Sequence, residues 1–207
     1  MQTESSGLRL ITGTEVERAV EVQARAFHND PLWVYMVPDE RERATLLRTC
    51  FRFVFRMSIG SRQAYGVATP LDGVAWWSAP QQRVPVRAIL RAGLPSLILS
   101  SFFLRVFKVI PILAHFEEMQ KRYAPEPHYY LNTIAVAPEA QGTGLASKLI
   151  RPFVARADAE RVSMYTETMT PANVTLYEHY GFRTMEEYKV PNTNLRVWGF
   201  YRPVPPR

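Results

Sequence analysis

The residues best suited to chemistry form a glycine-containing turn, Gln-Gly-Thr-Gly at residues 141–144, which follows an apolar run and precedes a helical pattern. The first amides of a helix have no acceptor within the helix and lie at its positive end, so they suit a phosphate group. Glycine lets the backbone approach phosphate oxygens because it has no Cβ. The dinucleotide-binding fingerprint is absent, since Ser147 stands where its third glycine would be, and no P-loop Gly-Lys-Ser/Thr follows. The turn alone leaves two alternatives open, a phosphate site or an ordinary connection between a strand and a helix.

The elements that would position this turn follow from apolar periodicity and turn residues. Strands are expected at residues 8–11, 64–69, 74–79, 129–136, 162–167, 182–190 and 196–201, and helices after residues 14 and 39, within 83–122, from about 145 and after 170. Thr14 with Glu17 resembles a capping box, and Asp39 with Glu42 opens the next helix in the same way. Pro152 should bend or interrupt the helix from residue 145. This order predicts an α/β fold with a mixed sheet.

Composition indicates one globular domain over residues 1–207, with 47% hydrophobic and 21% charged residues. The formal net charge of +6 favours an anionic partner, but the basic residues are dispersed, so a nucleotide cofactor fits better than a nucleic acid. Cys50 is the single cysteine; it excludes an internal disulfide, fits a reducing cytoplasm and is expected in the core. No metal is expected, because metal-ligand spacing is missing around His28, His115 and His179.

Residues 92–104 form the most apolar stretch and carry no formal charge. A membrane-spanning helix needs ~20 apolar residues, so no span is expected, and the stretch reads as a buried or substrate-covering helix. The apolar residues between 97 and 113 could pack on the chain's own core or on a second subunit, which leaves both a monomer and a homodimer open.

The pattern Val-x-Pro-x-x-Gln-Gly-x-Gly-x-Ala at residues 136–146 resembles the acetyl-CoA motif of the GNAT superfamily. The resemblance continues in register through residues 165–168, Asn173, residues 176–182 and residues 197–202, and it is poorest over residues 83–122. Within the superfamily the chain is most similar to the branch that contains puromycin N-acetyltransferase, which has a similar Glu-Thr strand end.

This resemblance implies a mixed, mostly antiparallel central sheet of about six to seven strands flanked by helices. Residues 129–182 would form the acetyl-CoA-binding core, and residues 83–122 would be a helical insertion on the substrate side, before the central strand. The implied reaction is direct transfer of an acetyl group from the thioester to an amine.

Acetyl-CoA is the implied cosubstrate. The backbone of residues 134–136 would pair with the pantetheine arm and polarise the thioester carbonyl, and the amides of residues 141–146 would hold the pyrophosphate. The expected cofactor contacts are Ile134, Ala135, Val136, Gln141, Gly142, Thr143, Gly144, Leu145, Ala146 and Asn173. For Asn173 the alternative is a polar residue that only serves the first turn of its helix.

Tyr177 matches the general acid of the superfamily, which protonates the departing CoA thiolate; alternatively, it only packs against Phe182. Glu167 is the first candidate for the base that deprotonates the amine, with a purely structural strand-end carboxylate as the alternative. His128 is a second candidate on the substrate side, unless it is an exposed turn histidine.

The acceptor is expected to lie against Phe27, Asp30 and Trp33 and under the helices of residues 83–122. Asp30 could attract an ammonium group or simply end a helix before proline. Trp76 and Trp77 are adjacent on one strand, so one should face the core and the other could reach the cleft.

These expectations favour an acetyl-CoA-dependent N-acetyltransferase acting on a primary amine of a small molecule, such as an antibiotic-like or aminoacyl-like amine. The alternatives are a non-catalytic acyl-CoA-binding module and a protein N-terminal or lysine acetyltransferase. The identity of the acceptor stays open.

Overall fold

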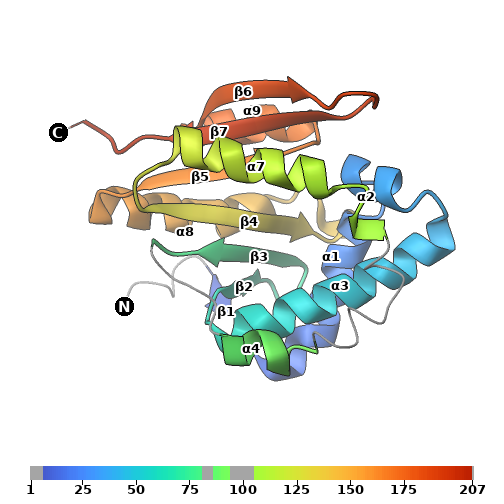
Figure 1. The fold of residues 1–207 in the computed structure, drawn as a ribbon. Coiled ribbons are helices and arrows are strands. Elements are labelled where there is room, and N and C mark those ends of the chain that lie inside the picture. Colours follow the sequence, from blue (N-terminus) through green and yellow to red (C-terminus); the bar gives the residue numbers. More distant parts are fainter. Residues whose placement is uncertain (1–6, 81–85, 94–104, 207) are drawn as a thin grey trace.

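The computed structural model describes residues 7–80, 86–93 and 105–206 (Figure 1). The strands in these residues are β1 (Arg9–Leu10), β2 (Ala64–Val67), β3 (Gly73–Ser78), β4 (His128–Val136), β5 (Ser163–Thr168), β6 (Arg183–Lys189) and β7 (Arg196–Arg202). The helices are α1 (Val16–Ala26), α2 (Pro31–Met36), α3 (Glu40–Gly60), α4 (Val86–Arg91), α7 (Ile110–Tyr123), α8 (Leu145–Glu160) and α9 (Ala172–His179), with short 3-10 turns η1 (Gly13–Glu15) and η2 (Pro138–Ala140). Every strand expected from the sequence is present, with ends that shift by one to a few residues.

The strands form one open sheet with the order β1-β2-β3-β4-β5-β7-β6 among the described residues. Strands β4 and β5 run parallel, and the other neighbouring pairs are antiparallel. The parallel pairing begins at His128 with Ser163 and ends at Leu131 with Thr166. Beyond this last pair, β4 continues to Val136 without β5 beside it. The mixed, mostly antiparallel sheet is confirmed, and it splits halfway along its central strand.

A β-bulge lies where the split begins. Trp76 of β3 is opposite Thr133, and Trp77 is opposite Leu131, so Asn132 is an extra residue on β4. The Asn132 amide donates to Ser78 Oγ at 2.9 Å and to the Tyr130 carbonyl at 3.2 Å, which fixes the bulge. The bulge reverses which side chains face each side of β4, and no signal in the sequence predicted it.

Helices cover both faces of the sheet, with α7 in front of β5 and β7 and with α8 and α9 behind the sheet in Figure 1. One apolar core joins α1, α2, α3 and α7 to the first face, and a second core joins α8 and α9 to the other. Trp77 is buried in the second core and stacks on Phe153 of α8 at 4.6 Å between ring centroids. Trp76 is partly exposed, and its Nε1 donates to Gln63 Oε1 at 3.0 Å. The two tryptophans therefore point to opposite faces, as expected.

The N-terminal capping box lies two residues earlier than predicted. The Glu15 carboxylate accepts hydrogen bonds from the backbone N–H and the hydroxyl of Thr12, at 3.1 and 2.8 Å, so the box joins Thr12 and Glu15 instead of Thr14 and Glu17. The sequence offers Thr-x-x-Glu at both places, and the short turn η1 before α1 selects the first.

Asp39 caps α3 as predicted, because its Oδ1 accepts from the Glu42 amide at 2.8 Å. We expect Asp39→Ala to lower the free energy of unfolding by about 1 kcal/mol, because a first-turn amide loses its acceptor. Urea unfolding followed by circular dichroism measures this change. Asp39→Asn is the matched control, since the amide oxygen still accepts; an equal loss in both variants would contradict the capping explanation.

The segment expected to be helical over residues 83–122 contains α4 and α7, while residues 94–104, the core of the apolar stretch, lie outside the described part of the chain. Helix α8 continues through Pro152, so this proline does not end the helix. Among the described residues, no helix combines the length and the apolar character that crossing a membrane requires.

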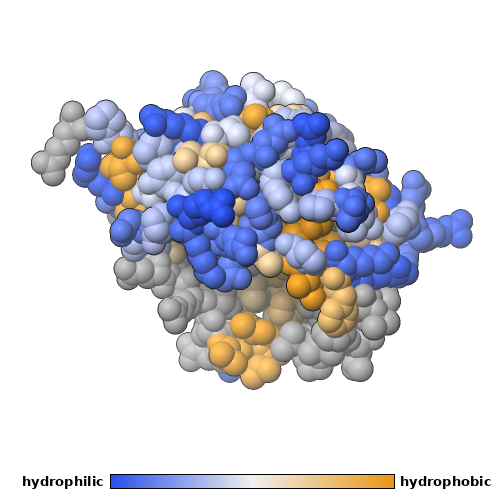
Figure 2. All heavy atoms as spheres, turned by 45° about the horizontal axis from the view of Figure 1, so that its top comes forward, coloured by the Kyte–Doolittle hydropathy of each residue, from blue (hydrophilic) through white to orange (hydrophobic). Residues whose placement is uncertain are grey.

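Large apolar side chains remain exposed next to polar ones on the face seen in Figure 2, where hydrophobic residues gather below a mostly hydrophilic area. Among the described residues, the exposed large apolar ones are Val34, Tyr35, Val86, Leu90, Phe107, Ile110, Leu113 and Met185.

Candidate active site

The predicted turn connects β4 to α8 through η2 and has left-handed backbone at both glycines. Gly142 has φ +77° and Gly144 has φ +83°, a conformation that residues with a Cβ adopt at a cost. A Cβ built at either position would meet no atom within 4 Å. Glycine is thus required by the backbone conformation, and the space beside the turn is open.

The amides of this turn are available to a ligand. The Ala140 amide donates to the Ala137 carbonyl at 2.8 Å, and the Gln141 amide donates to the Pro138 carbonyl at 3.4 Å. The next amide along the chain with a backbone acceptor is that of Lys148, which donates to the Gly144 carbonyl at 3.2 Å. Within the described residues, the amides of residues 142–147 have no acceptor in the chain. Several unpaired N–H groups at the start of a helix fit a pyrophosphate.

Two ion pairs hold the turn against the rest of the fold. Arg25 of α1 binds Glu139 of η2 with two hydrogen bonds of 2.9 and 2.8 Å. Arg18 of the same helix donates to the Leu71 carbonyl at 2.9 Å and pairs with Asp72, whose own carbonyl accepts from the Ala137 amide at 2.7 Å. Helix α1 therefore positions the turn, a role that the sequence did not indicate.

We expect Gly144→Ala to weaken acetyl-CoA binding at least tenfold, because forcing a residue with a Cβ into left-handed space costs about 1–2 kcal/mol or moves the amides. Isothermal titration calorimetry with acetyl-CoA measures the change. Gly13→Ala is the matched control, since Gly13 also has open space around a Cβ but not the left-handed backbone. Equal binding by Gly144→Ala and the control would rule out this turn as the phosphate site.

Glu167 stands at the mouth of the split in the sheet. It directly follows Thr166, which makes the last pair between β5 and β4. Its Oε2 accepts a hydrogen bond from the Tyr130 hydroxyl at 2.8 Å, and its Oε1 is buried with no partner among the described residues. Burial raises the pKa of Glu167 to about 7, although the hydroxyls of Tyr130 and Tyr165 act to lower this pKa. A carboxyl with a pKa near 7 is suited to accept a proton at neutral pH.

Tyr177 approaches the same place from the other face of the sheet. Its side chain is buried in α9 between Phe182 and Phe200, at ring distances of 5.8 and 5.2 Å. Burial raises the pKa of Tyr177 to about 12, although the nearby Thr166 hydroxyl acts to lower it, and the charge of Glu167 raises it further. The phenol therefore keeps its proton at neutral pH. Packing against Phe182 and proximity to Glu167 occur together, so the two interpretations of Tyr177 are compatible.

The structure places Glu167 and Tyr177 on opposite faces of the sheet near Thr166, where the pairing of β5 with β4 ends. Residues 134–136 lie in the unpaired half of β4. For Asn173, the structure shows a contact within its own turn. Its amide donates to Thr168 Oγ1 at 3.1 Å, and the same oxygen accepts from the Thr170 amide at 3.2 Å. Asn173 thus closes the turn between β5 and α9, and its contact with the cofactor stays a prediction.

The residues expected on the acceptor side between α1 and α2 each have a structural partner. Asp30 Oδ1 caps α2 by accepting from the amides of Leu32 and Trp33, at 3.0 and 3.4 Å, and burial raises its pKa to about 6. The rings of Phe27 and Trp33 pack on Phe51 of α3, at 5.3 and 5.8 Å between centroids. These contacts hold α2 in place, and binding of an acceptor here stays a prediction.

His128 lies apart from that group, because it begins β4 at the end of the strand opposite to α2 (Figure 1). Its Nδ1 lies 2.8 Å from the Glu126 carbonyl, and its Nε2 lies 2.9 Å from the Gln120 amide nitrogen. Both ring nitrogens are therefore already engaged. The described residues contain no cluster of three or more His, Cys, Asp or Glu that could hold a metal ion.

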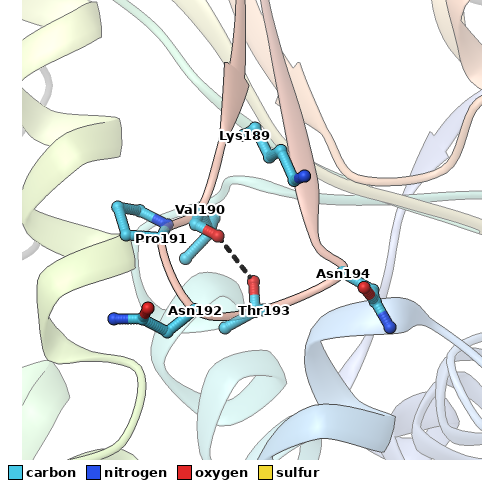
Figure 3. Close-up of a pocket in the computed structure, with 6 residues that line it drawn as sticks. All are labelled: Lys189, Val190, Pro191, Asn192, Thr193 and Asn194. Atoms are coloured by element: carbon cyan, nitrogen blue, oxygen red, sulfur yellow. Dashed lines mark hydrogen bonds between the residues drawn. The ribbon is translucent and has the colours of Figure 1, made fainter.

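Sequence reasoning missed Tyr130, which holds Glu167, and the hollow beside the loop between β6 and β7. Figure 3 shows that this loop lines a depression with Lys189, Val190, Pro191, Asn192, Thr193 and Asn194. The Thr193 hydroxyl donates to the Val190 carbonyl at 2.9 Å, which stiffens the loop. The sequence predicted the loop itself but contained no signal for a hollow.

Known proteins resemble the chain in sequence and in fold. Residues 112–184 match a family model described as the acetyltransferase (GNAT) domain. An uncharacterised N-acetyltransferase of Schizosaccharomyces pombe, C550.08, is 25% identical over 194 residues, which cover 90% of this chain and 78% of that protein.

Two solved structures have a similar fold. An acetyltransferase of Corynebacterium glutamicum, described as histone acetyltransferase HPA2 and related acetyltransferase, has a TM-score of 0.68 at 20% identity and 97% coverage of both chains. The polyamine N-acetyltransferase of Drosophila melanogaster has a TM-score of 0.62 at 11% identity, with 95% of this chain and 99% of that chain covered. At such identities these structures establish the fold.

Proposed function

We propose that this chain is an acetyltransferase of the GNAT type that transfers the acetyl group of acetyl-CoA directly to a primary amine of a small molecule. The domain match over residues 112–184 and the similar fold support this proposal. The observation that carries the proposal is the split in the sheet. Glu167, a carboxyl whose pKa burial raises to about 7, follows Thr166, where the pairing of β5 with β4 ends, and Tyr177, a neutral buried phenol, lies near Thr166 on the other face.

In the proposed reaction, acetyl-CoA lies with its pyrophosphate on the amides of residues 142–147 and its pantetheine arm along residues 134–136. Glu167 takes a proton from the acceptor's ammonium group, and the neutral amine attacks the thioester carbonyl. As the C–S bond breaks, Tyr177 donates its proton to the CoA thiolate, and the resulting phenolate takes the second proton that the nitrogen loses as the amide forms. An acid and a base on opposite faces of the split allow both transfers without a covalent enzyme intermediate.

A small acceptor is supported by the helix that covers the site. Helix α7 packs on β5 and β7 on the face where Glu167 points, which limits the room for a folded protein segment (Figure 1). Among proteins of similar fold, the Drosophila melanogaster structure is named a polyamine N-acetyltransferase and another an arylalkylamine N-acetyltransferase of Aedes aegypti. The resemblance to the puromycin N-acetyltransferase branch adds an aminonucleoside to the acceptors worth testing.

The first experiment is to incubate purified protein with acetyl-CoA and amines and to follow release of the free CoA thiol. The panel holds puromycin, other aminonucleosides, polyamines, arylalkylamines, aminoglycosides, amino acids and short peptides. Release with one class of small amine supports the proposal and identifies the acceptor. Release only with peptides would favour a protein acetyltransferase, the class that the description of the Corynebacterium glutamicum structure suggests. Binding of acetyl-CoA without release by any amine would favour a non-catalytic module.

The same preparation tests the oligomeric state, for which we propose a monomer or a homodimer. Exposed apolar residues such as Val34 of α2 and Leu113 of α7 could bury against a second copy. Light scattering after size exclusion chromatography distinguishes the two states.

A further inference from the structure

Two glutamates lie in one row across three strands of the sheet. Glu167 of β5 pairs with Gly199 of β7, and Gly199 pairs on its other side with Glu186 of β6. Residues directly opposite each other on neighbouring strands point to the same face. Both carboxylates therefore face α7, with their Cα atoms about 10 Å apart and a residue without a side chain between them.

The Tyr165 hydroxyl occupies the space over that glycine. A Cβ at Gly199 would lie 3.3 Å from Tyr165 Oη and 3.2 Å from Met119 Sδ of α7. Tyr165 is fully buried, and its hydroxyl has no hydrogen-bond partner among the described residues. It interacts with the Glu167 carboxylate, but not at the distance and angle of a hydrogen bond. Because an unpaired buried polar group costs about 1–3 kcal/mol, this hydroxyl calls for an explanation.

At the other end of the row, Glu186 contacts residues of α7 that lie nearer the surface. It accepts from the Tyr123 hydroxyl at 2.8 Å and from Arg122 at 3.3 Å, and its Oε1 lies 2.9 Å from His115 Nε2. The His115 side chain is 16% exposed and also approaches Glu118, which is largely solvent-accessible. The row thus joins the buried Glu167 to titratable groups that contact water.

Other polar groups around Tyr165 do not offer such a route. The Tyr130 ring lies 6.0 Å away, and its hydroxyl is bonded to Glu167; the His128 ring lies 5.9 Å away with both nitrogens engaged. On the other face, Tyr177 recovers the proton that it gives to the CoA thiolate from the acceptor nitrogen, so it does not take the proton held by Glu167.

We propose that Tyr165 passes protons from Glu167 to Glu186, so that Glu167 loses its proton on the side of α7 and not through the substrate opening; this inference rests on the proposed function. Glu167 takes a proton from the ammonium group of the acceptor. Glu167 then gives a proton to Tyr165 Oη while the proton of Tyr165 moves to Glu186, directly or through one water. Glu186 releases it to His115 or to solvent. Tyr165 ends unchanged, and Glu167 is again ionised.

The test variant is Tyr165→Phe, which removes only the hydroxyl. We expect kcat to fall about tenfold, a part of the roughly 10²–10⁴ that acid–base catalysis supplies. The midpoint of the pH profile and the pKa of Glu167, followed by carboxyl ¹³C NMR, should both rise, since this hydroxyl acts to lower that pKa. Thermal stability should stay equal or increase, because an unpaired hydroxyl has been removed. Tyr129→Phe is the matched control: its hydroxyl bonds Glu160 at 2.6 Å, away from the site, and kcat should not change.

A second variant, Glu186→Gln, tests the outer half of the route. We expect it to lower kcat as Tyr165→Phe does, and the double variant to lose no more than either single one, because the two residues act in series. If the wild type is active, an unchanged kcat and an unchanged pKa of Glu167 in Tyr165→Phe would overturn the relay. Additive losses of kcat in the double variant would overturn it as well. A wild type that releases no CoA thiol with any amine would instead reject the proposed function, and the relay with it.

Discussion

Replacing Tyr177 with phenylalanine is expected to lower kcat about a hundredfold, within the range that a general acid contributes. The variant can no longer protonate the CoA thiolate, and in the described part of the site the other buried phenols, Tyr130 and Tyr165, face the opposite side of the sheet with Glu167. Steady-state release of the CoA thiol measures the change. The dissociation constant of acetyl-CoA should stay within about twofold, because the missing interaction belongs to the transition state.

Stability separates this role from simple packing. The phenylalanine ring keeps the contacts that Tyr177 makes with Phe182 and Phe200, so the melting temperature should hardly move. Tyr65→Phe is the matched control, because Tyr65 packs on Phe153 behind the same sheet without reaching the split. Full activity of Tyr177→Phe would exclude it as the acid. Tyr180 stands three residues further along the chain, and a loss in Tyr180→Phe alone would transfer the role to it. Neither result would affect the fold.

Replacing Glu167 with glutamine is expected to lower kcat/KM by roughly 10²-fold or more at pH 8, because the amide cannot take the proton of the acceptor. In the wild type, kcat/KM should rise with pH and level off above a midpoint of about 7, the value to which burial raises the pKa of Glu167. The variant should lose this rise. A pH profile with an unchanged midpoint in Glu167→Gln would assign the base to another group.

The same variant should unfold at a higher temperature than the wild type at pH 8. The pKa of Glu167 in the folded state lies above its ordinary value, so folding favours the protonated carboxyl. This contribution is fully present below about pH 4.5 and is lost as the pH rises through 7. Differential scanning calorimetry at pH 5 and pH 8 should show the advantage of glutamine growing with pH. Glu117→Gln is the control, since Glu117 is exposed and pairs only with Lys121 among the described residues; an equal gain there would point to a general charge effect.

Local signals in the sequence were sufficient for most elements and for the turn between β4 and α8. Gly142 and Gly144 follow an apolar strand and precede a helix, and each of these features depends on residues a few positions apart. Asp39 could be recognised as a cap for the same reason. Glu167 and Tyr177 were identified through resemblance to a family, and their spacing alone gave no reason to place them together.

The tertiary structure alone decided what surrounds those two side chains. The bulge at Asn132 depends on the register between β3 and β4, and the split depends on where β5 leaves β4. The row Glu167–Gly199–Glu186 joins positions that are up to 32 residues apart, and its existence follows from strand order. Hydrogen bonds between strands and the burial that raises a pKa are long-range, so periodicity and motif spacing carry no information about them. The sequence by itself determined the chemical groups and the turn, and the packing of the sheet against α7 and α9 determined which groups meet.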